Sequence, residues 1–356
     1  MHKYQIVELK EKNQHAGSKA REDVAYFANE AGYEPMYIKC HFIKNDSLLE
    51  RALRFIKPFP CWLKAFFKIK KNSIVLVQNP FYHRHLGRKQ CLKFLKKIKK
   101  CKIVSVIHDA EFLRGSIWLD ENTKNEFEFM KSNSDYEIVH NDFMKEAFIE
   151  KGFNEGQLVS LKIFDYHTGE KIQPREPGNN TADIIVAGNL RTDKSPYIYL
   201  FNNVENRFSV NLYGPNYDGA AESDNIKYHG SFPSGEVPNI IDGKFGLVWD
   251  GDSIDECSGE TGNYLRYNNP HKTSLYLVSR HPVVIWKEAA MARFIENENI
   301  GICVNSLTEI KAKIDSISEE EYYVMMRNVE NIAERLENGF YLKTALKECE
   351  SRISKE

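Results

Sequence analysis

The sequence predicts an α/β protein made of two doubly wound domains that face each other across a cleft. Short apolar runs, typical of buried parallel strands, alternate with helix-like segments in two successive arrays. One polar stretch containing Pro and Gly, residues 167–181, separates the arrays and predicts a linker. A length of 356 residues suffices for two domains. We place these domains at 1–170 and 182–338, with 339–356 packing back on the first.

The first array consists of strands with covering helices between them. Strands are predicted at 4–9, 34–40, 73–77, 102–107, 137–140 and 158–163. Helices are predicted at 18–31, 84–100 and 142–151. Ser18 is placed to cap the first helix, and Glu22 and Asp23 suit the positive end of its dipole. The helix at 84–100 sets apolar residues against a basic face, as a helix that covers a sheet should.

The second array repeats the same alternation after the linker. Strands are predicted at 183–187, 208–213, 245–249 and 282–285. Helices are predicted at 272–278, 288–297, 307–314 and 319–336. Because doubly wound sheets bind ligands beyond the carboxyl ends of their strands, we expect the functional residues at those ends.

The net charge of −1 conceals a strongly basic segment. Residues 51–102 contain 16 lysines and arginines and no aspartate or glutamate. Such a segment predicts an anionic partner: a lipid surface, a pyrophosphate-linked substrate, or nucleic acid. Residues 60–69 interleave aromatics with lysine, which is typical of a helix lying on a membrane. A solvated basic helix held on its own core by Trp62, Phe66 and Phe67 explains the same residues, as does an interface between subunits of a homo-oligomer.

The remaining composition predicts a cytoplasmic protein, with peripheral contact at the inner face of the membrane through residues 51–102. The sequence has no run of 18 apolar residues, and its first residues lack the apolar core of a secretory signal. Its seven cysteines are scattered without a CxxC pair, which favours reduced thiols. The phosphate-binding motif GxxxxGK[ST], HExxH, GxSxG and GxGxxG are all missing, so the alternation does not indicate NAD binding.

The most informative stretch of the sequence is 263–286, NYLRYNNPHKTSLYLVSRHPVVIW. Pro270 marks a helix start that places Lys272 and Thr273 in the first turn. Free backbone N–H groups and the helix dipole favour a phosphate there, and Lys272 adds a positive charge. An exposed lysine at a frayed helix start is the alternative. Earlier in the same array, Gly188 and Asn189 end a strand and Arg191 follows, whose guanidinium suits a diphosphate.

The stretch resembles the donor-binding region of bacterial β-1,6-galactofuranosyltransferases and the related streptococcal adhesin glucosyltransferases. Further similarity lies, in order, at Ala16-Gly17-Ser18-Lys19-Ala20, His108-Asp109, Gly188-Asn189 and Phe245-Gly-Leu-Val-Trp249. The resemblance implies the GT-B arrangement, with two Rossmann-like domains and a C-terminal helix crossing back to the first. One departure is Val278-Ser279-Arg280, where relatives carry small residues, which leaves the donor less defined.

The resemblance implies transfer of galactofuranose or glucose from a UDP-sugar to a glycan acceptor, lipid-linked in one interpretation, in surface polysaccharide or glycoprotein synthesis. The transfer would be inverting and independent of metal or other cofactor. Arg191 and Lys272 would hold the diphosphate. Tyr267, Asn268 and Thr273 would line the donor site together with Gly188 and Asn189. The loop 16–19, with Gly17 and Ser18, would close over the donor.

The general base is sought at the end of the strand 102–107, where His108 and Asp109 follow directly. Asp109 is the first candidate, because a carboxylate is ionised at neutral pH, His108 is the second and Glu111 a third. Alternatively, Asp109 caps the next helix and His108 packs beneath it. Asp250 and Asp252 form a DxD pair of the kind that holds a metal, but Arg191 and Lys272 would make a metal unnecessary.

A second class of function stays open at this point. A non-catalytic protein with a transferase-like fold could use the basic segment to bind nucleic acid or an anionic membrane. The enzyme is the preferred hypothesis, without nucleic acid as a partner. The two hypotheses differ in whether a uridine nucleotide stabilises the protein.

Overall fold

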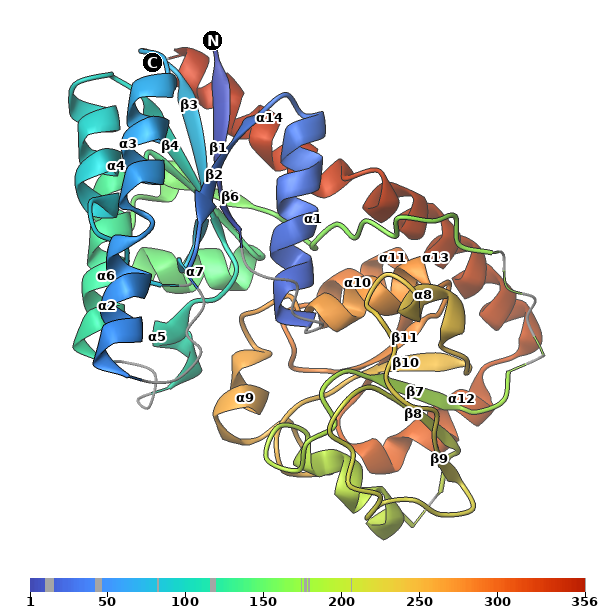
Figure 1. Cartoon of the computed structure of the whole chain (residues 1–356). Helices are drawn as coiled ribbons and strands as arrows, with labels where there is room; N and C mark the ends of the chain where they lie inside the picture. The colour runs from blue at the N-terminus through green and yellow to red at the C-terminus, as the bar shows by residue number, and fades with distance from the viewer. Residues whose placement is uncertain are drawn as a thin grey trace. The chain divides into compact units, whose positions relative to one another are not determined.

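The computed structural model describes residues 1–9, 16–41, 47–81, 83–115, 120–173, 175, 178, 180–205 and 207–355, without the side chains of 16–18. The chain divides into two compact units (Figure 1). The first unit comprises Met1–Leu161 together with Leu342–Glu356, and the second comprises Lys162–Tyr341. Each unit contains one six-stranded sheet in which all strand pairs are parallel.

The sheet of the first unit has the strand order β2-β1-β3-β4-β5-β6. Its strands are β1 (Lys3–Leu9), β2 (Glu34–Lys39), β3 (Ile74–Asn79), β4 (Lys102–Ile107), β5 (Tyr136–Val139) and β6 (Leu158–Ser160). The helices between them are α1 (Ala16–Glu30), α2 (Leu48–Ile56), α3 (Phe59–Lys68), α4 (Arg88–Lys97), α5 (Glu111–Arg114), α6 (Glu121–Asn133) and α7 (Asp142–Glu150), with a 3-10 turn η2 (Glu155–Gln157). The order reverses between β1 and β3, as in a doubly wound sheet.

The core of the first unit forms because its central strands are apolar on both faces. All six residues of β3 are buried, and β4 is buried after its first residue. Trp62 of α3 and Leu92 of α4 pack into the same cluster as Val75 and Ile103. The sequence-based interpretation of Trp62 as a core anchor is therefore right. Phe67, which was assigned the same role, is 76% exposed.

The sheet of the second unit has the order β12-β11-β10-β7-β8-β9. Its strands are β7 (Ile184–Ala187), β8 (Val210–Tyr213), β9 (Ile226–Tyr228), β10 (Phe245–Val248), β11 (Val283–Trp286) and β12 (Gly301–Val304). Its helices are η3 (Pro196–Asn203), α8 (Val237–Ile240), α9 (Gly259–Tyr264), α10 (His271–Val278), α11 (Ala292–Glu298), η4 (Leu307–Glu309), α12 (Ile310–Ser316) and α13 (Glu319–Glu337). In chain order this is the doubly wound pattern 3-2-1-4-5-6, whose switch point lies between β7 and β10.

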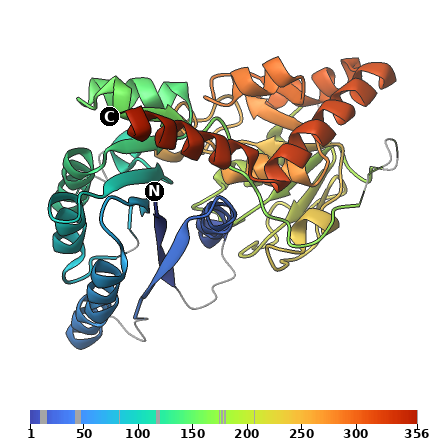
Figure 2. The ribbon, with the colours of Figure 1, turned by 90° about the horizontal axis from the view of Figure 1, so that it is seen from above.

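The last helix, α14 (Phe340–Lys355), returns to the first unit. Glu350 accepts hydrogen bonds from Lys3 Nζ at 3.1 Å and from Tyr33 Oη at 2.9 Å. Leu346 and Cys349 are fully buried. Figure 2 shows this red helix running beside the strands near the N-terminus. The predicted GT-B architecture, two Rossmann-like units with a returning C-terminal helix, is confirmed.

Most differences from the sequence-based elements concern short or marginal segments. Helix α1 begins at Ala16, so Ser18 does not precede it as a cap, and residues 16–19 are helical rather than a loop. Residues 10–15 lie outside the described part of the chain. Strand β9 was not predicted, because only Ile226 of its three residues is buried and no alternation marks it. In the part of the chain that the structure describes, no helix is both long enough and apolar enough to cross a bilayer.

Candidate active site

Glycines at the carboxyl edge of the second sheet allow the turns after neighbouring strands to pack closely. Gly188 follows β7, and Trp249 follows its neighbour β10. Gly214, at the end of β8, has a positive φ of 140°, and a Cβ there would lie 1.8 Å from the carbonyl oxygen of Gly188. Only glycine therefore lets these two turns approach each other. The result is a surface formed by main chain at the carboxyl edge, where doubly wound sheets bind ligands.

A hydrogen bond to the main chain holds the Lys272 side chain at this edge. Lys272 lies in the first turn of α10, and its Nζ donates to the main-chain oxygen of Trp249 at 2.8 Å. The N-cap residue Pro270 offers no side-chain cap to the first turn. The ammonium and the amino end of the helix dipole thus concentrate positive charge beside the end of β10. The alternative considered from sequence, an exposed lysine at a frayed helix start, does not match this geometry.

Two buried polar oxygens, on residues close to Lys272 in the sequence, lack a hydrogen-bond partner among the described residues. Thr273 is fully buried, and its Oγ1 has no hydrogen-bond partner among the described residues. The Oδ1 of Asn268 is buried and equally unsatisfied in that part of the chain. Leaving such an atom unpaired costs about 1–3 kcal/mol. A bound ligand with donor groups would remove that cost, so these atoms favour a binding site at the start of α10.

The other residues that the sequence predicts to bind the UDP-sugar include Asn189 and Arg191, which follow β7, and Tyr267. Asn189 Oδ1 accepts from the main-chain nitrogen of Arg191 at 3.2 Å and from Asn216 Nδ2 at 3.0 Å, which shapes the turn. Arg191 is 53% exposed and forms an ion pair with Asp193. An exposed pair of this kind is worth about 0–1 kcal/mol, so a diphosphate could replace Asp193 at little cost. The side chain of Tyr267 is partly buried.

The carboxylates of the acidic loop after β10 accept hydrogen bonds from groups of the same loop. Asp250 accepts from the main-chain nitrogen of Gly251 at 3.0 Å, and Asp252 accepts from the hydroxyl of Ser258. Close packing keeps this loop compact, because a Cβ on Gly251 would lie 2.4 Å from the carbonyl oxygen of Ser258. The two carboxylates therefore have local roles, and their part in metal binding stays a hypothesis.

The carboxyl edge of the first sheet carries the predicted base. Asp109 lies two residues beyond β4, and its Oδ1 accepts from Arg114 at 2.6 Å. The N-cap of α5 is Ala110, so the alternative that Asp109 caps this helix is wrong. Glu111 contacts the same guanidinium at 3.5 Å. The sequence singled out the carboxylates but missed Arg114, whose contact with Asp109 depends on the turn of α5.

Protein surroundings tune the two carboxyl groups in the same direction. Burial raises the pKa of Asp109 above its usual value, and the charges of Arg114 and Arg21 oppose that rise. Burial also raises the pKa of Glu111, again opposed by Arg114. A carboxylate with a raised pKa is a stronger proton acceptor than one with the usual pKa. Asp109 keeps 34% of its side chain exposed, so a substrate hydroxyl could reach it.

His108 is the weaker candidate because its ring is already committed. It is buried, and its Nε2 lies 2.7 Å from Gln78 Oε1. Gln78 Nε2 donates to the main-chain oxygen of Arg21 at 3.2 Å, which orients the amide oxygen toward His108. Nε2 of His108 must therefore carry the proton and donate it to that oxygen. This matches the sequence-based alternative in which His108 packs beneath the edge.

Three possible metal ligands meet elsewhere in the first unit. Within the described residues, Glu8, Cys40 and His85 are the one group with at least three such atoms within 4.8 Å. Trp62 Nε1 donates to His85 Nδ1 at 3.4 Å, and an indole nitrogen can only donate. The proton of the neutral imidazole is then on Nε2, which lies 3.8 Å from Cys40 Sγ. Neither ring nitrogen is left to bind a metal.

The same contacts show that His85 does not contribute to the surface of the basic segment 51–102 in which it lies. The residue is 5% exposed. Burial, followed by the charge of Arg88, lowers the pKa of His85 to about 4. The ring is therefore neutral and acts as a hydrogen-bonded core group.

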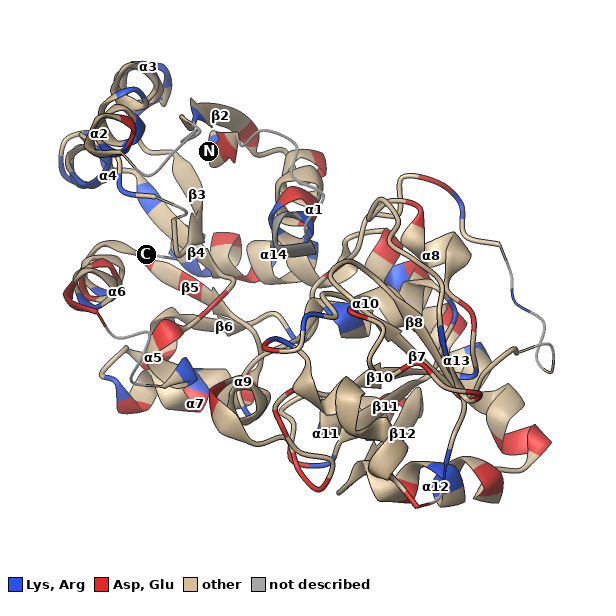
Figure 3. Cartoon of the chain, turned by 60° about the horizontal axis from the view of Figure 1, so that its bottom comes forward, with Lys and Arg blue, Asp and Glu red and all other residues tan. Residues whose placement is uncertain are grey.

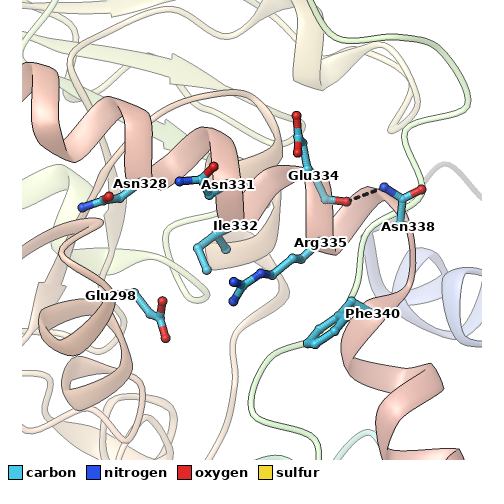
Figure 4. A pocket seen from close by; sticks show the side chains of 8 residues that line it. All are labelled: Glu298, Asn328, Asn331, Ile332, Glu334, Arg335, Asn338 and Phe340. Atoms are coloured by element: carbon cyan, nitrogen blue, oxygen red, sulfur yellow. Dashed lines mark hydrogen bonds between the residues drawn. The ribbon is translucent and has the colours of Figure 1, made fainter.

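Two surface cavities of the second unit lie away from the carboxyl edge. One of about 630 Å³ lies along α13, and Figure 4 shows Arg335 and Phe340 among its lining side chains. Glu298, on its rim, precedes the start of β12. Another, of about 340 Å³, is lined by Asp183 and Lys244, which precede β7 and β10. Both therefore lie toward the amino ends of the strands, opposite to the expected site.

Comparisons with known protein families match both units. The N-terminal domain of glucosyltransferase 3-like proteins matches residues 3–163, and the C-terminal domain of the same proteins matches residues 184–349. The β-1,6-galactofuranosyltransferase of Escherichia coli (strain K12) is 33% identical, covering 97% of each chain. Glucosyltransferase 3 of Streptococcus gordonii is 22% identical, covering 92% of each.

Solved structures with the same fold share little sequence with this chain. Anabaena HepE, in complex with UDP and glucose, superposes with a TM-score of 0.61 at 10% identity, covering 98% of this chain and 100% of that one. Sucrose-phosphate synthase of Thermosynechococcus elongatus gives a TM-score of 0.61 at 11% identity, covering 99% and 100%. At these identities the likeness concerns the fold.

Proposed function

This chain belongs to the glucosyltransferase 3-like family, so it is a glycosyltransferase, and from that premise we propose that it moves galactofuranose or glucose from a UDP-sugar to a glycan acceptor. The 33% identity to a galactofuranosyltransferase, against 22% to a glucosyltransferase, favours galactofuranose. Family membership also favours the enzyme over the non-catalytic binding protein. The acceptor we propose is a glycan of surface polysaccharide or glycoprotein synthesis.

The observation that carries the donor site is the start of α10. Lys272 brings a charge to the end of β10, and Thr273 and Asn268, close to it in the sequence, each have a buried oxygen without a hydrogen-bond partner in the described part of the chain. A nucleoside diphosphate supplies both an anion for Lys272 and ribose or base donors for the two oxygens. Arg191 would exchange Asp193 for the diphosphate. Gly188 and Asn189 would leave room for it, and Tyr267 would line the donor; the part of Gly17 and Ser18 stays a proposal.

The proposed reaction is a single displacement. An acceptor hydroxyl oxygen attacks the anomeric carbon of the donor as the bond from that carbon to the diphosphate breaks, with inversion. Asp109 takes the hydroxyl proton, and its raised pKa suits this role. Lys272 and Arg191 stabilise the charge that develops on departing UDP. These two cations would supply the charge that a metal provides in other transferases.

The test is a thermal-shift and UDP-release experiment with UDP-galactofuranose, UDP-glucose and free UDP. We expect UDP to raise the melting temperature of the wild type and Lys272→Ala to abolish both the shift and UDP release. Thr273→Val keeps the shape of the side chain, so it should weaken UDP binding by about five- to tenfold, the loss of one hydrogen bond, without lowering stability.

Lys227→Ala is the matched control, since Lys227 is exposed on β9 of the same unit. It should leave the UDP shift and UDP release unchanged. A wild-type protein whose melting temperature does not respond to UDP at millimolar concentration would refute the proposal.

A further inference from the structure

Helix α2 exposes its apolar face. The helix has no buried residue, although six of its nine residues are apolar. Leu48 is 83% exposed, Leu49 68% and Ile56 51%. At helical spacing these three side chains fall on one side, whereas Glu50 and Arg54 fall on the other. An amphipathic helix normally buries such a face against a core, so this face is available to a partner.

The neighbouring helices α3 and α4 continue the apolar surface. Phe67 of α3 is 76% exposed, and Leu63 44%. Phe66 links the two helices, because its ring lies 5.4 Å from that of Phe67 and 6.4 Å from that of Phe94 on α4. The main-chain nitrogen of Leu86 donates to the oxygen of Phe55 at 2.8 Å, which joins the start of α4 to the end of α2. The ring contacts join α3 to α4, and the main-chain bond places the end of α2 beside the segment that leads into α4.

The charge of this surface is positive. Residues 51–102, which include nearly all of it, contain 16 basic and no acidic residues. Blue segments recur on α2, α3 and α4 in Figure 3. Lys64 of α3 and Lys97 of α4 are exposed beside Leu63 and Ile98. The one acidic residue of α2, Glu50, points away from the apolar face and pairs with His41 at 2.9 Å.

We propose that the exposed face of α2, α3 and α4 is a docking surface for an anionic lipid bilayer. Leucine, isoleucine and phenylalanine side chains enter the boundary between headgroups and acyl chains, and the surrounding lysines contact lipid phosphates. This goes beyond the proposed transfer reaction, because the surface requires no donor and no acceptor. Docking would retain the enzyme where a lipid-linked glycan is displayed.

Charge complementarity selects the bilayer over the other occupants. A second copy of the chain meeting this face through a two-fold axis would oppose one basic surface to another and would leave the lysines unpaired. Nucleic acid would satisfy the lysines, but its phosphates would leave Leu48, Leu49 and Ile56 exposed to a polar backbone. An anionic bilayer accommodates both kinds of side chain.

The structure also shows which lysines can carry this role. Lys96 forms an ion pair with Asp135 at 3.2 Å, and Lys99 donates to the main-chain oxygens of Phe66 and Ile69. Both therefore stabilise the fold and are unsuitable for a test. Within the described part of the chain, Lys64 and Lys97 are exposed and their ammonium groups form no ion pair, so their replacement probes the surface alone.

The experiment is flotation of the full-length protein with vesicles of phosphatidylcholine containing about one third phosphatidylglycerol, and with pure phosphatidylcholine vesicles. The wild type should bind the anionic vesicles and lose binding at high salt. Lys64→Ala and Lys97→Ala should each weaken binding about fivefold. Leu49→Ser with Ile56→Ser should weaken it about tenfold or more, since the apolar contribution is lost.

Matched controls remove the same groups elsewhere. Lys227→Ala with Lys347→Ala removes two exposed charges, and Phe143→Ser with Tyr323→Ser removes exposed rings of 45% and 48% exposure. Both should bind vesicles as the wild type does, and all variants should keep its melting temperature.

Three results would overturn the proposal. The first is a wild type that does not float with anionic vesicles. The second is equal loss of binding in surface and control variants. The third is a chain that oligomerises or retains an oligonucleotide through Leu49 and Ile56 while its vesicle binding is insensitive to these residues. UDP binding is measured separately, so failure of docking leaves the transferase function standing.

Discussion

At the scale of single residues, the proposed chemistry depends on Lys272 and Asp109, and each side chain is held by one neighbouring group. Lys272 was identified from its position after Pro270, and the structure adds its bond to Trp249. Asp109 was identified because it follows a strand, but its contact with Arg114 was missed. Position along one element is local information, whereas a partner depends on how a loop turns. Side-chain partners therefore require the structure.

The contact between Asp109 and Arg114 leads to a prediction about pH dependence. The Arg114 charge lowers the pKa of Asp109 against the rise caused by burial. Removing it by Arg114→Ala should raise that pKa further. Because Asp109 must be ionised to accept a proton, the acidic limb of the kcat/KM profile should then move to higher pH. The measurement is UDP release as a function of pH for wild type and Arg114→Ala.

Two further variants control this pH experiment. Asp109→Asn cannot accept a proton and should lower kcat by about 10²–10⁴-fold at every pH. Arg114→Lys keeps the charge and should leave the limb near its wild-type position. If Arg114→Ala merely lowers activity without moving the limb, Arg114 does not act through Asp109.

At the scale of elements, long buried runs were predictable and marginal ones were not. The strand at 102–107 matches β4 residue for residue, because five of its six side chains are buried. Strand β12 was missed because it begins with a glycine, Gly301, and because two of its four residues are only partly buried. Helix α2 was also missed, because it has no core to explain its apolar residues. The spacing of apolar residues therefore predicts an element reliably only where those residues are buried in the core.

Strand β5 contains a buried glutamate, Glu137, although glutamate side chains are rarely buried. Glu137 is 2% exposed and pairs in register with Ser105 of β4. Burial raises the pKa of Glu137 to about 7, with Ser105 and Ser134 opposing the rise. Because the folded-state pKa exceeds the unfolded value, protonation favours folding. This contribution is fully present below about pH 4.5 and is lost as the pH rises to about 7.

We therefore expect Glu137→Gln to flatten the pH dependence of unfolding. The wild type should lose on the order of 3 kcal/mol from this group between about pH 4.5 and 7, and the amide cannot ionise. The measurement is urea unfolding at several pH values across that window. Glu128→Gln removes an exposed carboxylate from α6 and should keep the wild-type slope. Parallel curves for Glu137→Gln and wild type would contradict the assignment.

At the scale of the whole molecule, the strand order supports the proposed donor site more directly than any motif does. Two βα arrays were predictable from alternation, and the order 3-2-1-4-5-6 of the second sheet adds the switch point between β7 and β10. Gly188 and Trp249 follow those strands. Strand order cannot be derived from the sequence of one chain, because it depends on which strands pair. The kind of site that we propose therefore comes from the sequence, and its proposed location comes from the topology.

The chain crosses between its units twice, since Leu342–Glu356 belongs to the first unit while the preceding residues belong to the second. Leu346 of α14 is fully buried in the first unit. We expect Leu346→Ala to destabilise that unit by about 2–5 kcal/mol, because it removes a buried side chain and leaves a cavity. Amide hydrogen exchange should show the loss of protection in β1 and β2, even though the substitution lies near the C-terminus. Lys347→Ala, at an exposed position of the same helix, should retain full protection. Equal loss of protection in β7 and β10 would mean that the units unfold as one, and the assignment of α14 to the first unit alone would fail.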